Sequence, residues 1–411
     1  MTQIQSIRGI VDQFPAINDH WDFILEILIS KAKTFGFGEI KLPILEKELL
    51  FVRSVGQQSD IVQKEMYAFE DQGNERISLR PEGTASCMRA YLNHCQRDAP
   101  FQRLWYFGPM FRRERPQKGR QRQFYQFGLE IIGYPEFYPD IELLLYCHEV
   151  FKVLSIDSSV RLEINYLPKA ESRAAYTDAL KEFFKPHIHA FDEIHRYRYE
   201  NNILRLLDTK DENILKLIQS APQLSDYYSP SEKEAFKTIS DHLTDRGISF
   251  KVNHRLVRGL DYYSGLVYEW ITDELGAQGT ICAGGRYDGL SEQLGGSPVG
   301  ATGLSIGMER LASLVAQQNT QRNVVYLVAN EPSMLAQIPK LVQTLTQQAI
   351  PYFVHYHCSQ KKKQIKRAQK YGARWLGIVN KESIEMIDLI SDNGCDDIPV
   401  TQLKEFYASR T

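Results

Sequence analysis

The sequence has 411 residues, of which 43% are apolar and 24% are charged, with a formal net charge of −2 at neutral pH. This composition excludes a disordered chain, and the length suffices for two or three folded domains. Charge is uneven along the chain, since residues 322–411 hold 12 Lys and Arg against 8 Asp and Glu, while the remaining residues hold 37 against 43. A basic C-terminal part indicates a polyanionic partner.

The six cysteines are scattered along the chain, and none forms a CxxC pair. This spacing favours reduced thiols over a disulfide framework or a zinc site. Residues 1–15 lack the apolar core of a secretion signal, and no apolar run is long enough to span a membrane. We therefore expect a cytoplasmic protein without a membrane partner.

The spacing of apolar residues predicts the elements of the first part of the chain. They are helices over 19–34, 84–95 and 139–155, a strand in GFGEIKLPILE that ends at Pro43, a strand in RISLRPEGT that enters a tight turn, and a hairpin formed by LWYFGPMFRRER and RQFYQFGLEIIG.

Alternation sorts the second hairpin strand into two faces. The apolar face, with Tyr125, Phe127, Leu129 and Ile131, is expected to face the core. The other face carries Gln126 and Glu130, which a small molecule could reach, with Gly128 leaving room between them.

The first hairpin strand ends in FRRERPQKGRQR, where six of the eleven residues 112–122 are basic. Arg112 and Glu114 share a face, and a glutamate beside an arginine keeps the guanidinium oriented to grip a phosphate. The tip over 115–122 suits phosphates or a nucleic-acid end. A solvated charged hairpin is the alternative, but polar and apolar residues alternate within the strand, which favours a functional site.

Four further motifs are ambiguous when each is taken alone. In RPEGT, Glu82 and Thr84 could hold an ammonium group or simply start a helix. LVRGLDYYSG holds Arg258, which could clamp a carboxylate or an α-phosphate, in a stretch that could equally be an aromatic core strand. CAGGRYDGL matches neither dinucleotide nor P-loop glycine patterns, so close approach to a ligand and plain turn chemistry both stay open. GLSIGMERL predicts a helix from about Gly303, with Arg310 facing a phosphate or the solvent.

The second half of the chain divides into a charged, irregular helical region over about 168–250 and a later strand–helix–strand pattern from residue 323. The first resembles an insertion between two sheet-forming parts. The second predicts a small βαβαβ domain. Its helix over 361–372 spaces basic side chains along one face, which suits RNA phosphates or solvent equally. His355 and His357 lack evident further ligands, so we do not favour a metal site there.

Together and in this order, these motifs resemble those of the histidyl-tRNA synthetase family of bacterial type, within the class II aminoacyl-tRNA synthetases. GFGEIKLPILE resembles motif 1, with Pro43 at the dimer-interface proline. FRRERPQKGRQRQFYQFGLE resembles motif 2, with Arg112 and Glu114 at its arginine and glutamate, and GLSIGMERL resembles motif 3, with Arg310 as its arginine. RGLDYY and AGGRYDGL resemble the two histidine-specific signatures, which other class II enzymes lack.

The resemblance implies an α+β fold in a homodimer. The catalytic domain would cover residues 1–320, with an antiparallel six-stranded sheet and the helical insertion at about 168–250, and an α/β anticodon-binding domain would cover 322–411. After NKESIEMIDL the chain is shorter than the family pattern and lacks its small-residue β-hairpin.

The implied reaction is activation of L-histidine with ATP to histidyl-adenylate, followed by transfer to histidine tRNA. Mg²⁺ would accompany ATP, through ligands that the sequence does not identify. Glu82, Thr84 and Gln126 would hold the substrate ammonium, and Glu130 and Tyr263 would recognise the imidazole. The full implied set is Arg258 and Arg112 in catalysis, Glu82, Thr84, Gln126, Glu130, Tyr262 and Tyr263 for histidine, Arg112, Glu114 and Arg310 for ATP, and Arg115 and Gln117 for the tRNA acceptor end.

Two other functions compete with this one. A synthetase-like paralogue is a regulatory subunit of ATP phosphoribosyltransferase in histidine biosynthesis and does not aminoacylate. That paralogue typically lacks parts of motif 2, the histidine signatures and the anticodon domain, whereas this chain has them. A non-catalytic RNA-binding regulator is hard to reconcile with a complete set of pocket residues. We therefore favour the enzyme.

Overall fold

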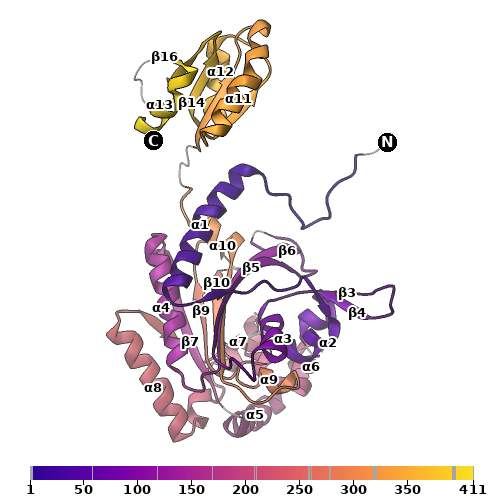
Figure 1. The fold of residues 1–411 in the computed structure, drawn as a ribbon. Coiled ribbons are helices and arrows are strands. Elements are labelled where there is room, and N and C mark those ends of the chain that lie inside the picture. The colour runs from indigo at the N-terminus through magenta and orange to yellow at the C-terminus, as the bar shows by residue number, and fades with distance from the viewer. Residues whose placement is uncertain are drawn as a thin grey trace. The chain divides into compact units, whose positions relative to one another are not determined.

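The computed structural model describes residues 3–57, 59–117, 119–168, 170–207, 209, 211–257, 260, 262–276, 279–317, 322–390 and 395–410. The chain divides into two compact units, Met1–Ala316 and Gln317–Thr411 (Figure 1). Among the described residues, no helix combines the length and apolar character needed to cross a membrane.

An eight-stranded sheet forms the centre of the first unit (Figure 1). Its six central strands are antiparallel, and one parallel strand is added at each edge, β1 beside β5 and β8 beside β7. The predicted antiparallel sheet of an α+β fold is therefore confirmed. In sheet order the strands are β1 (Gly38–Glu39), β5 (Gln102–Phe111), β6 (Gln123–Ile132), β11 (Ala301–Gly307), β10 (Thr280–Arg286), β9 (Gly265–Ile271), β7 (Arg161–Leu167) and β8 (Phe250–Val252).

Helices α1 (Pro15–Thr34), α4 (Tyr138–Val153) and α10 (Met308–Leu314) contribute to the core on one face of this sheet. Phe127, Leu129 and Ile131 of β6 are buried there, together with Ile24 and Leu28 of α1. The predicted division of β6 into a core face and a polar face is confirmed, because alternate residues of a strand point to opposite sides. The polar face of β6 thus points away from α1, α4 and α10.

A smaller layer packs near the polar face of the main sheet, and most of its elements precede β5 in the sequence. A three-stranded sheet and its helices pack with α9 around Phe51, Val55 and Ala85. The elements are β2 (Leu45–Lys47), β3 (Tyr67–Glu70), β4 (Arg76–Leu79), α2 (Glu48–Val55), the π-helix η1 (Ile61–Glu65), α3 (Thr84–His94) and α9 (Leu290–Gln293).

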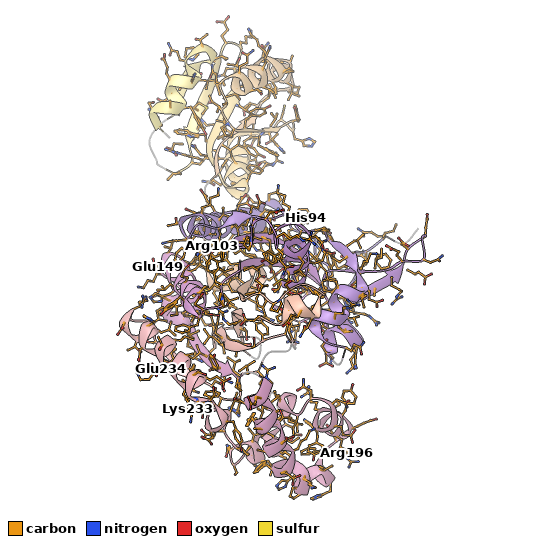
Figure 2. All side chains as sticks on the ribbon, turned by 60° about the horizontal axis from the view of Figure 1, so that its bottom comes forward. His94, Arg103, Glu149, Arg196, Lys233 and Glu234 are labelled. Carbon is orange, nitrogen blue, oxygen red and sulfur yellow. The ribbon has the colours of Figure 1, made fainter. Side chains whose placement is uncertain are left out.

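The region between β7 and β8 is helical. It packs around buried apolar residues such as Leu180, Phe184 and Leu206. Figure 2 shows Arg196 on α6 and Lys233 and Glu234 on α8, all exposed to solvent. The helices are α5 (Ala170–Phe184), α6 (Glu193–Asn201), α7 (Glu212–Ile218) and α8 (Pro230–Asp245), with the short 3₁₀ helices η3 (Lys185–Ala190), η4 (Ile203–Leu206) and η5 (Leu224–Tyr227), while η2 (Asp157–Ser159) precedes β7.

The second unit is a five-stranded mixed sheet in the order β13-β12-β14-β15-β16. Its β12–β13 and β12–β14 pairs are parallel, which confirms the predicted βαβαβ pattern. The expected lack of a β-hairpin after NKESIEMIDL was wrong, because β15, which lies within that segment, pairs in antiparallel fashion with β16. The elements are β12 (Arg322–Val328), η7 (Pro332–Gln337), α11 (Ile338–Gln347), β13 (Tyr352–His355), α12 (Lys361–Tyr371), β14 (Ala373–Val379), β15 (Ser383–Asp388), β16 (Cys395–Pro399), η8 (Val400–Gln402) and α13 (Leu403–Arg410).

The predicted helix start near Gly303 is also wrong. Residues 301–307 form β11, and helix α10 begins at Met308. Gly303 pairs with Glu130 across β11 and β6, and a Cβ at Gly303 would lie 1.7 Å from Glu130 Oε2. The small residues of GLSIG therefore serve close strand packing rather than the start of a helix.

Candidate active site

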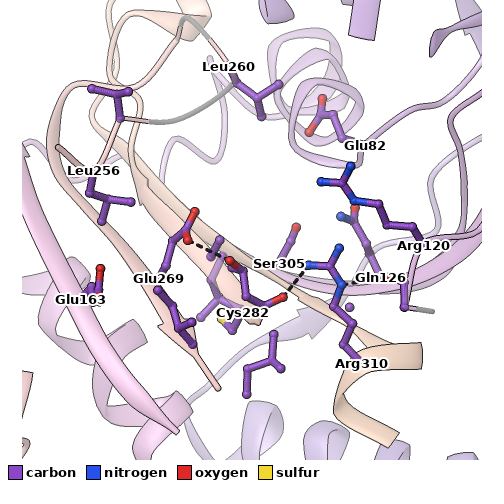
Figure 3. Close-up of a pocket in the computed structure, with 18 of the residues that line it drawn as sticks. Glu82, Arg120, Gln126, Glu163, Leu256, Leu260, Glu269, Cys282, Ser305 and Arg310 are labelled. Carbon is purple, nitrogen blue, oxygen red and sulfur yellow. Dashed lines mark hydrogen bonds between the residues drawn. The ribbon is translucent and has the colours of Figure 1, made fainter. Parts of the chain in front are cut away.

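A cavity of about 660 Å³ lies over the polar face of the main sheet (Figure 3). Its walls come from the main sheet, from the turn before α3, from the tip between β5 and β6, and from the helical region before β8. The predicted site residues among its lining are Glu82, Thr84, Arg112, Glu114, Gln126, Tyr262, Tyr263 and Arg310. Arg258 lies outside the described residues.

One end of the cavity is formed by the RPEGT turn and β6. Glu82 is buried, and its carboxylate accepts hydrogen bonds from the backbone N–H groups of Thr84 and Ala85, at 2.7 and 2.9 Å. Burial raises the pKa of Glu82. Among the described residues, Gln126 Oε1 is buried without a hydrogen-bond partner. An unpaired amide oxygen, a carboxylate and a hydroxyl suit a substrate ammonium group.

Glu130 lies behind this end and is not part of the cavity lining. Its Oε1 accepts from the Thr84 hydroxyl at 2.8 Å and from the Tyr106 hydroxyl at 3.1 Å, and its Oε2 accepts from Tyr287. Complete burial raises the pKa of Glu130 to about 8, although the hydroxyl donors oppose the shift. The space left by Gly128, which the sequence assigns to a ligand, is filled by the Tyr106 ring.

Arginine side chains line the cavity beside this end (Figure 3). Arg112 donates through Nε to the Pro81 carbonyl at 2.9 Å, and its guanidinium lies 5.2 Å from the centre of the Phe124 ring. Arg310 donates to the Gly119 carbonyl at 3.0 Å and to the Thr280 carbonyl at 2.6 Å. These bonds hold both guanidinium groups at the cavity wall, which suits an anionic ligand such as a phosphate chain.

Glu114 lines the same basic region. Its Oε2 lies 3.0 Å from Arg120 Nη1, and this ion pair ties the start of the hairpin tip to its return. Burial and the charges of Arg120 and Arg112 lower the pKa of Arg310, because nearby cations disfavour another positive charge. An anion placed between these arginines would relieve that repulsion.

The predicted tRNA residues, Arg115 and Gln117, do not line the cavity. Arg115 borders a shallow surface hollow together with Arg8, Arg113 and Arg122. Gln117 forms an isolated bridge with Arg120 at the tip. The N-terminal segment supports this hairpin, since the Gly9 carbonyl accepts from the Arg122 N–H at 2.7 Å.

Three tyrosines from the two glycine-containing motifs form an aromatic cluster. The ring centres of Tyr262 and Tyr263 are 4.7 Å apart, and that of Tyr287 is 5.7 Å from Tyr262 and 6.5 Å from Tyr263. The helical region fixes this cluster, because Arg173 of α5 donates to the Tyr263 carbonyl at 2.9 Å.

Sequence reasoning missed Tyr106, Tyr287 and Glu309. Tyr287 lies within AGGRYDGL, and an aromatic residue between two charged ones could have marked it as inward-facing. Glu309 of GLSIGMERL lines the cavity and accepts from the Tyr125 N–H at 3.0 Å, and burial raises its pKa to about 7. Nothing local marks Tyr106, which is one of many apolar residues of β5.

Comparison with known proteins identifies the family. A model of the family described as histidyl-tRNA synthetase matches residues 9–311. The chain belongs to the histidyl-tRNA synthetase family. The structure of apo histidyl-tRNA synthetase from S. aureus is 28% identical and superimposes with a TM-score of 0.79, covering 98% of this chain and 100% of that one.

Two more solved structures, each 20% identical, share the fold. Histidyl-tRNA synthetase from Nostoc sp. PCC 7120 gives a TM-score of 0.68 and covers 99% of this chain and 100% of that one. A Bacillus halodurans C protein, described as an ATP phosphoribosyltransferase regulatory subunit/histidyl-tRNA synthetase, gives 0.64 and covers 89% and 97%. This fold is thus shared by proteins described as histidyl-tRNA synthetases and by one that is also described as a regulatory subunit.

Proposed function

We propose that this chain is a histidine–tRNA ligase. It would activate L-histidine with ATP to form histidyl-adenylate and pyrophosphate, and then transfer the histidyl group to the 3′ end of histidine tRNA with release of AMP. Family membership supports this reaction class, and the composition of the cavity is the observation that carries it.

The cavity brings two chemically different groups of side chains together in one space. Glu82, Thr84 and Gln126 supply acceptors for an ammonium group, while Arg112 and Arg310 supply guanidinium groups for phosphates. An amino acid and a nucleotide held in this way would have the carboxylate and the α-phosphate side by side. Holding two reactants in attack geometry is itself a large part of catalysis.

The remaining roles follow from that arrangement. Arg112 and the sequence-predicted Arg258 would stabilise the negative charge that develops when the carboxylate attacks the α-phosphate. Tyr262, Tyr263 and Glu130 would recognise the imidazole, and Glu114 would orient the nucleotide arginines. Mg²⁺ would arrive with ATP and screen its phosphates. The described residues contain no group of three or more His, Cys, Asp or Glu able to hold a metal ion, and we assign it no protein ligand.

The tRNA would contact two places on the chain. Arg115 and Gln117 at the hairpin tip are proposed to meet the acceptor end, and Arg115 borders the arginine-lined surface hollow. The second unit is proposed to bind the anticodon, and the exposed Lys363, Lys366 and Lys370 of α12 offer phosphate contacts. A homodimer formed around Pro43 completes the proposal.

Pyrophosphate exchange with purified protein, ATP and Mg²⁺, one amino acid at a time, tests the first half-reaction. Exchange that depends on histidine alone is the expected result. No exchange with any amino acid, from folded protein, would overturn the proposal. Charging of histidine tRNA under the same conditions tests the second half-reaction.

A regulatory subunit of ATP phosphoribosyltransferase is the second candidate function. The observation that favours it is the shared fold with the Bacillus halodurans C protein described in that way. Histidine binding without exchange, combined with co-purification with the phosphoribosyltransferase, would favour this alternative.

A further inference from the structure

Tyr106 occupies an unusual position beneath the candidate active site. It belongs to β5, is 1% exposed and does not line the cavity. Its ring lies between two glycines, because a Cβ at Gly83 would be 2.3 Å from ring atom Cε2 and a Cβ at Gly128 would be 2.2 Å from Cζ. No side chain fits at either position while the ring is there, since such contacts are far below van der Waals distance.

The two glycines belong to the two segments that carry the proposed histidine-binding residues. Gly83 lies between Glu82 and Thr84, and Gly128 lies between Gln126 and Glu130. Tyr106 and Gly128 are also direct partners across β5 and β6. The ring is therefore the spacer between the RPEGT turn and β6, and its thickness sets their separation.

The Tyr106 hydroxyl has a second effect on Glu130. Each carboxylate oxygen has two lone pairs, and Oε1 uses both, one for Thr84 at 2.8 Å and one for Tyr106 at 3.1 Å. Oε2 accepts from Tyr287 alone among the described residues. Oε2 lies against the Gly303 backbone, since a Cβ at Gly303 would be 1.7 Å from it, and the whole Glu130 side chain is buried behind the cavity wall.

We propose that Tyr106 is a positioning residue for substrate recognition: its ring spaces the Glu82–Thr84 turn from β6, and its hydroxyl, bonded to Oε1, holds the Glu130 carboxyl group in place behind that turn. This inference rests on the proposed function. Under that function Glu130 recognises the imidazole, so a Glu130 carboxyl group that is held less firmly should discriminate less well against a ring without an N–H.

Tyr106→Phe keeps the ring and removes only the hydroxyl. The matched control is Tyr91→Phe, which removes another buried hydroxyl from the same apolar cluster, bonded to the Pro100 carbonyl at 3.1 Å and remote from Glu130. Histidine binding is followed by calorimetry without ATP, and steady-state pyrophosphate exchange is measured for both substrates. Thienylalanine, which has a ring of similar size without an N–H, is the competitor.

In Tyr106→Phe we expect the KM and Kd for histidine to rise about tenfold, as for loss of one buried hydrogen bond, with KM for ATP and kcat within about twofold of wild type. Its preference for histidine over thienylalanine should fall, and Tyr91→Phe should match wild type throughout. Gly128→Ala, which displaces the ring itself, should lose histidine binding more severely.

Wild-type protein that binds histidine, together with a Tyr106→Phe variant of unchanged KM and selectivity, would overturn this inference and leave the proposed ligase intact. An equal rise in the KM for both substrates would also overturn it, because a general structural defect affects both. Wild-type protein that binds no histidine would overturn the proposed function and this inference together.

Discussion

Arg286 donates through Nε and Nη2 to a single oxygen of Asp140, at 3.0 and 2.7 Å, in a site where both side chains are buried. The other Asp140 oxygen accepts from the Thr302 hydroxyl at 2.7 Å. This network joins β10, β11 and α4, and it leaves the neighbouring Tyr287 pointing toward Glu130. The charged residues of AGGRYDGL thus brace the scaffold, while the tyrosine between them serves the site.

Replacing Arg286 with Met should destabilise the first unit by about 3–5 kcal/mol, because Asp140 would keep a buried and uncompensated charge. Denaturant unfolding followed by tryptophan fluorescence measures the loss. Asp273→Ala is the control, since it breaks the exposed Arg161–Asp273 pair of 2.7 Å and should cost no more than about 1 kcal/mol. Similar losses for the two variants would contradict a bracing role for Arg286.

The main elements of the fold could be predicted because their signals are local. Apolar residues alternate along β6 and recur at helical spacing along α1, and these patterns mark the side of each element that faces the core. In the structure those apolar residues lie in one buried cluster or pack against it. The start of α10 could not be predicted in this way, since Gly303 is fixed by a strand partner more than a hundred residues away in sequence.

Most candidate site residues were found because motifs mark them, but their contacts could not be predicted. Glu130 was expected at a surface open to a ligand, and it lies buried behind Thr84. Tyr106 was missed altogether, because its role depends on Gly83 and Gly128, which no spacing rule connects to it. Contacts between distant segments are the part that sequence patterns do not carry.

Gln126→Ala should raise the KM for histidine by about tenfold to a hundredfold and leave the KM for ATP unchanged. Its buried Oε1 has no partner among the described residues, and the proposal gives that oxygen a charged ammonium donor, worth about 1.5–3 kcal/mol. Pyrophosphate exchange at varied histidine provides the measurement. A variant whose KM rises for ATP instead would place Gln126 at the nucleotide.

Arg310→Ala should lower exchange activity chiefly through weaker ATP binding, with histidine affinity by calorimetry unchanged. The side chain lies at the cavity wall with Arg112 and Arg120, and removing it also frees the Gly119 carbonyl of the hairpin tip. Arg374→Ala, on β14 of the second unit, is the control and should exchange at the wild-type rate. If histidine affinity fell as much as ATP affinity, Arg310 would act on the whole cavity.

Stability should depend on pH through Glu130. Its pKa is about 8 in the folded protein and near 4.5 in the unfolded chain, so the folded state holds the extra proton between these values. Stability from this group therefore falls as pH rises through that window, by up to about 1.4 kcal/mol per pH unit. Glu130→Gln removes the titration, so the melting temperature of wild type should decline relative to the variant from about pH 5.5 to about pH 8. Parallel curves would show that Glu130 does not bind the proton.

Leu49→Arg should weaken the proposed homodimer. Beside Pro43, the side chains of Ile44, Leu45 and Leu49 are 42%, 47% and 52% exposed, and clustered apolar side chains on a surface mark an interaction site. A two-fold interface places each changed residue in the contact twice, so one buried arginine per chain disturbs it strongly. Light scattering after gel filtration should show a dimer for wild type and a shift toward monomer for the variant. Ile194→Arg, at a 58% exposed position on α6, should stay dimeric. A dimeric Leu49→Arg variant would place the interface elsewhere and remove Pro43 from it.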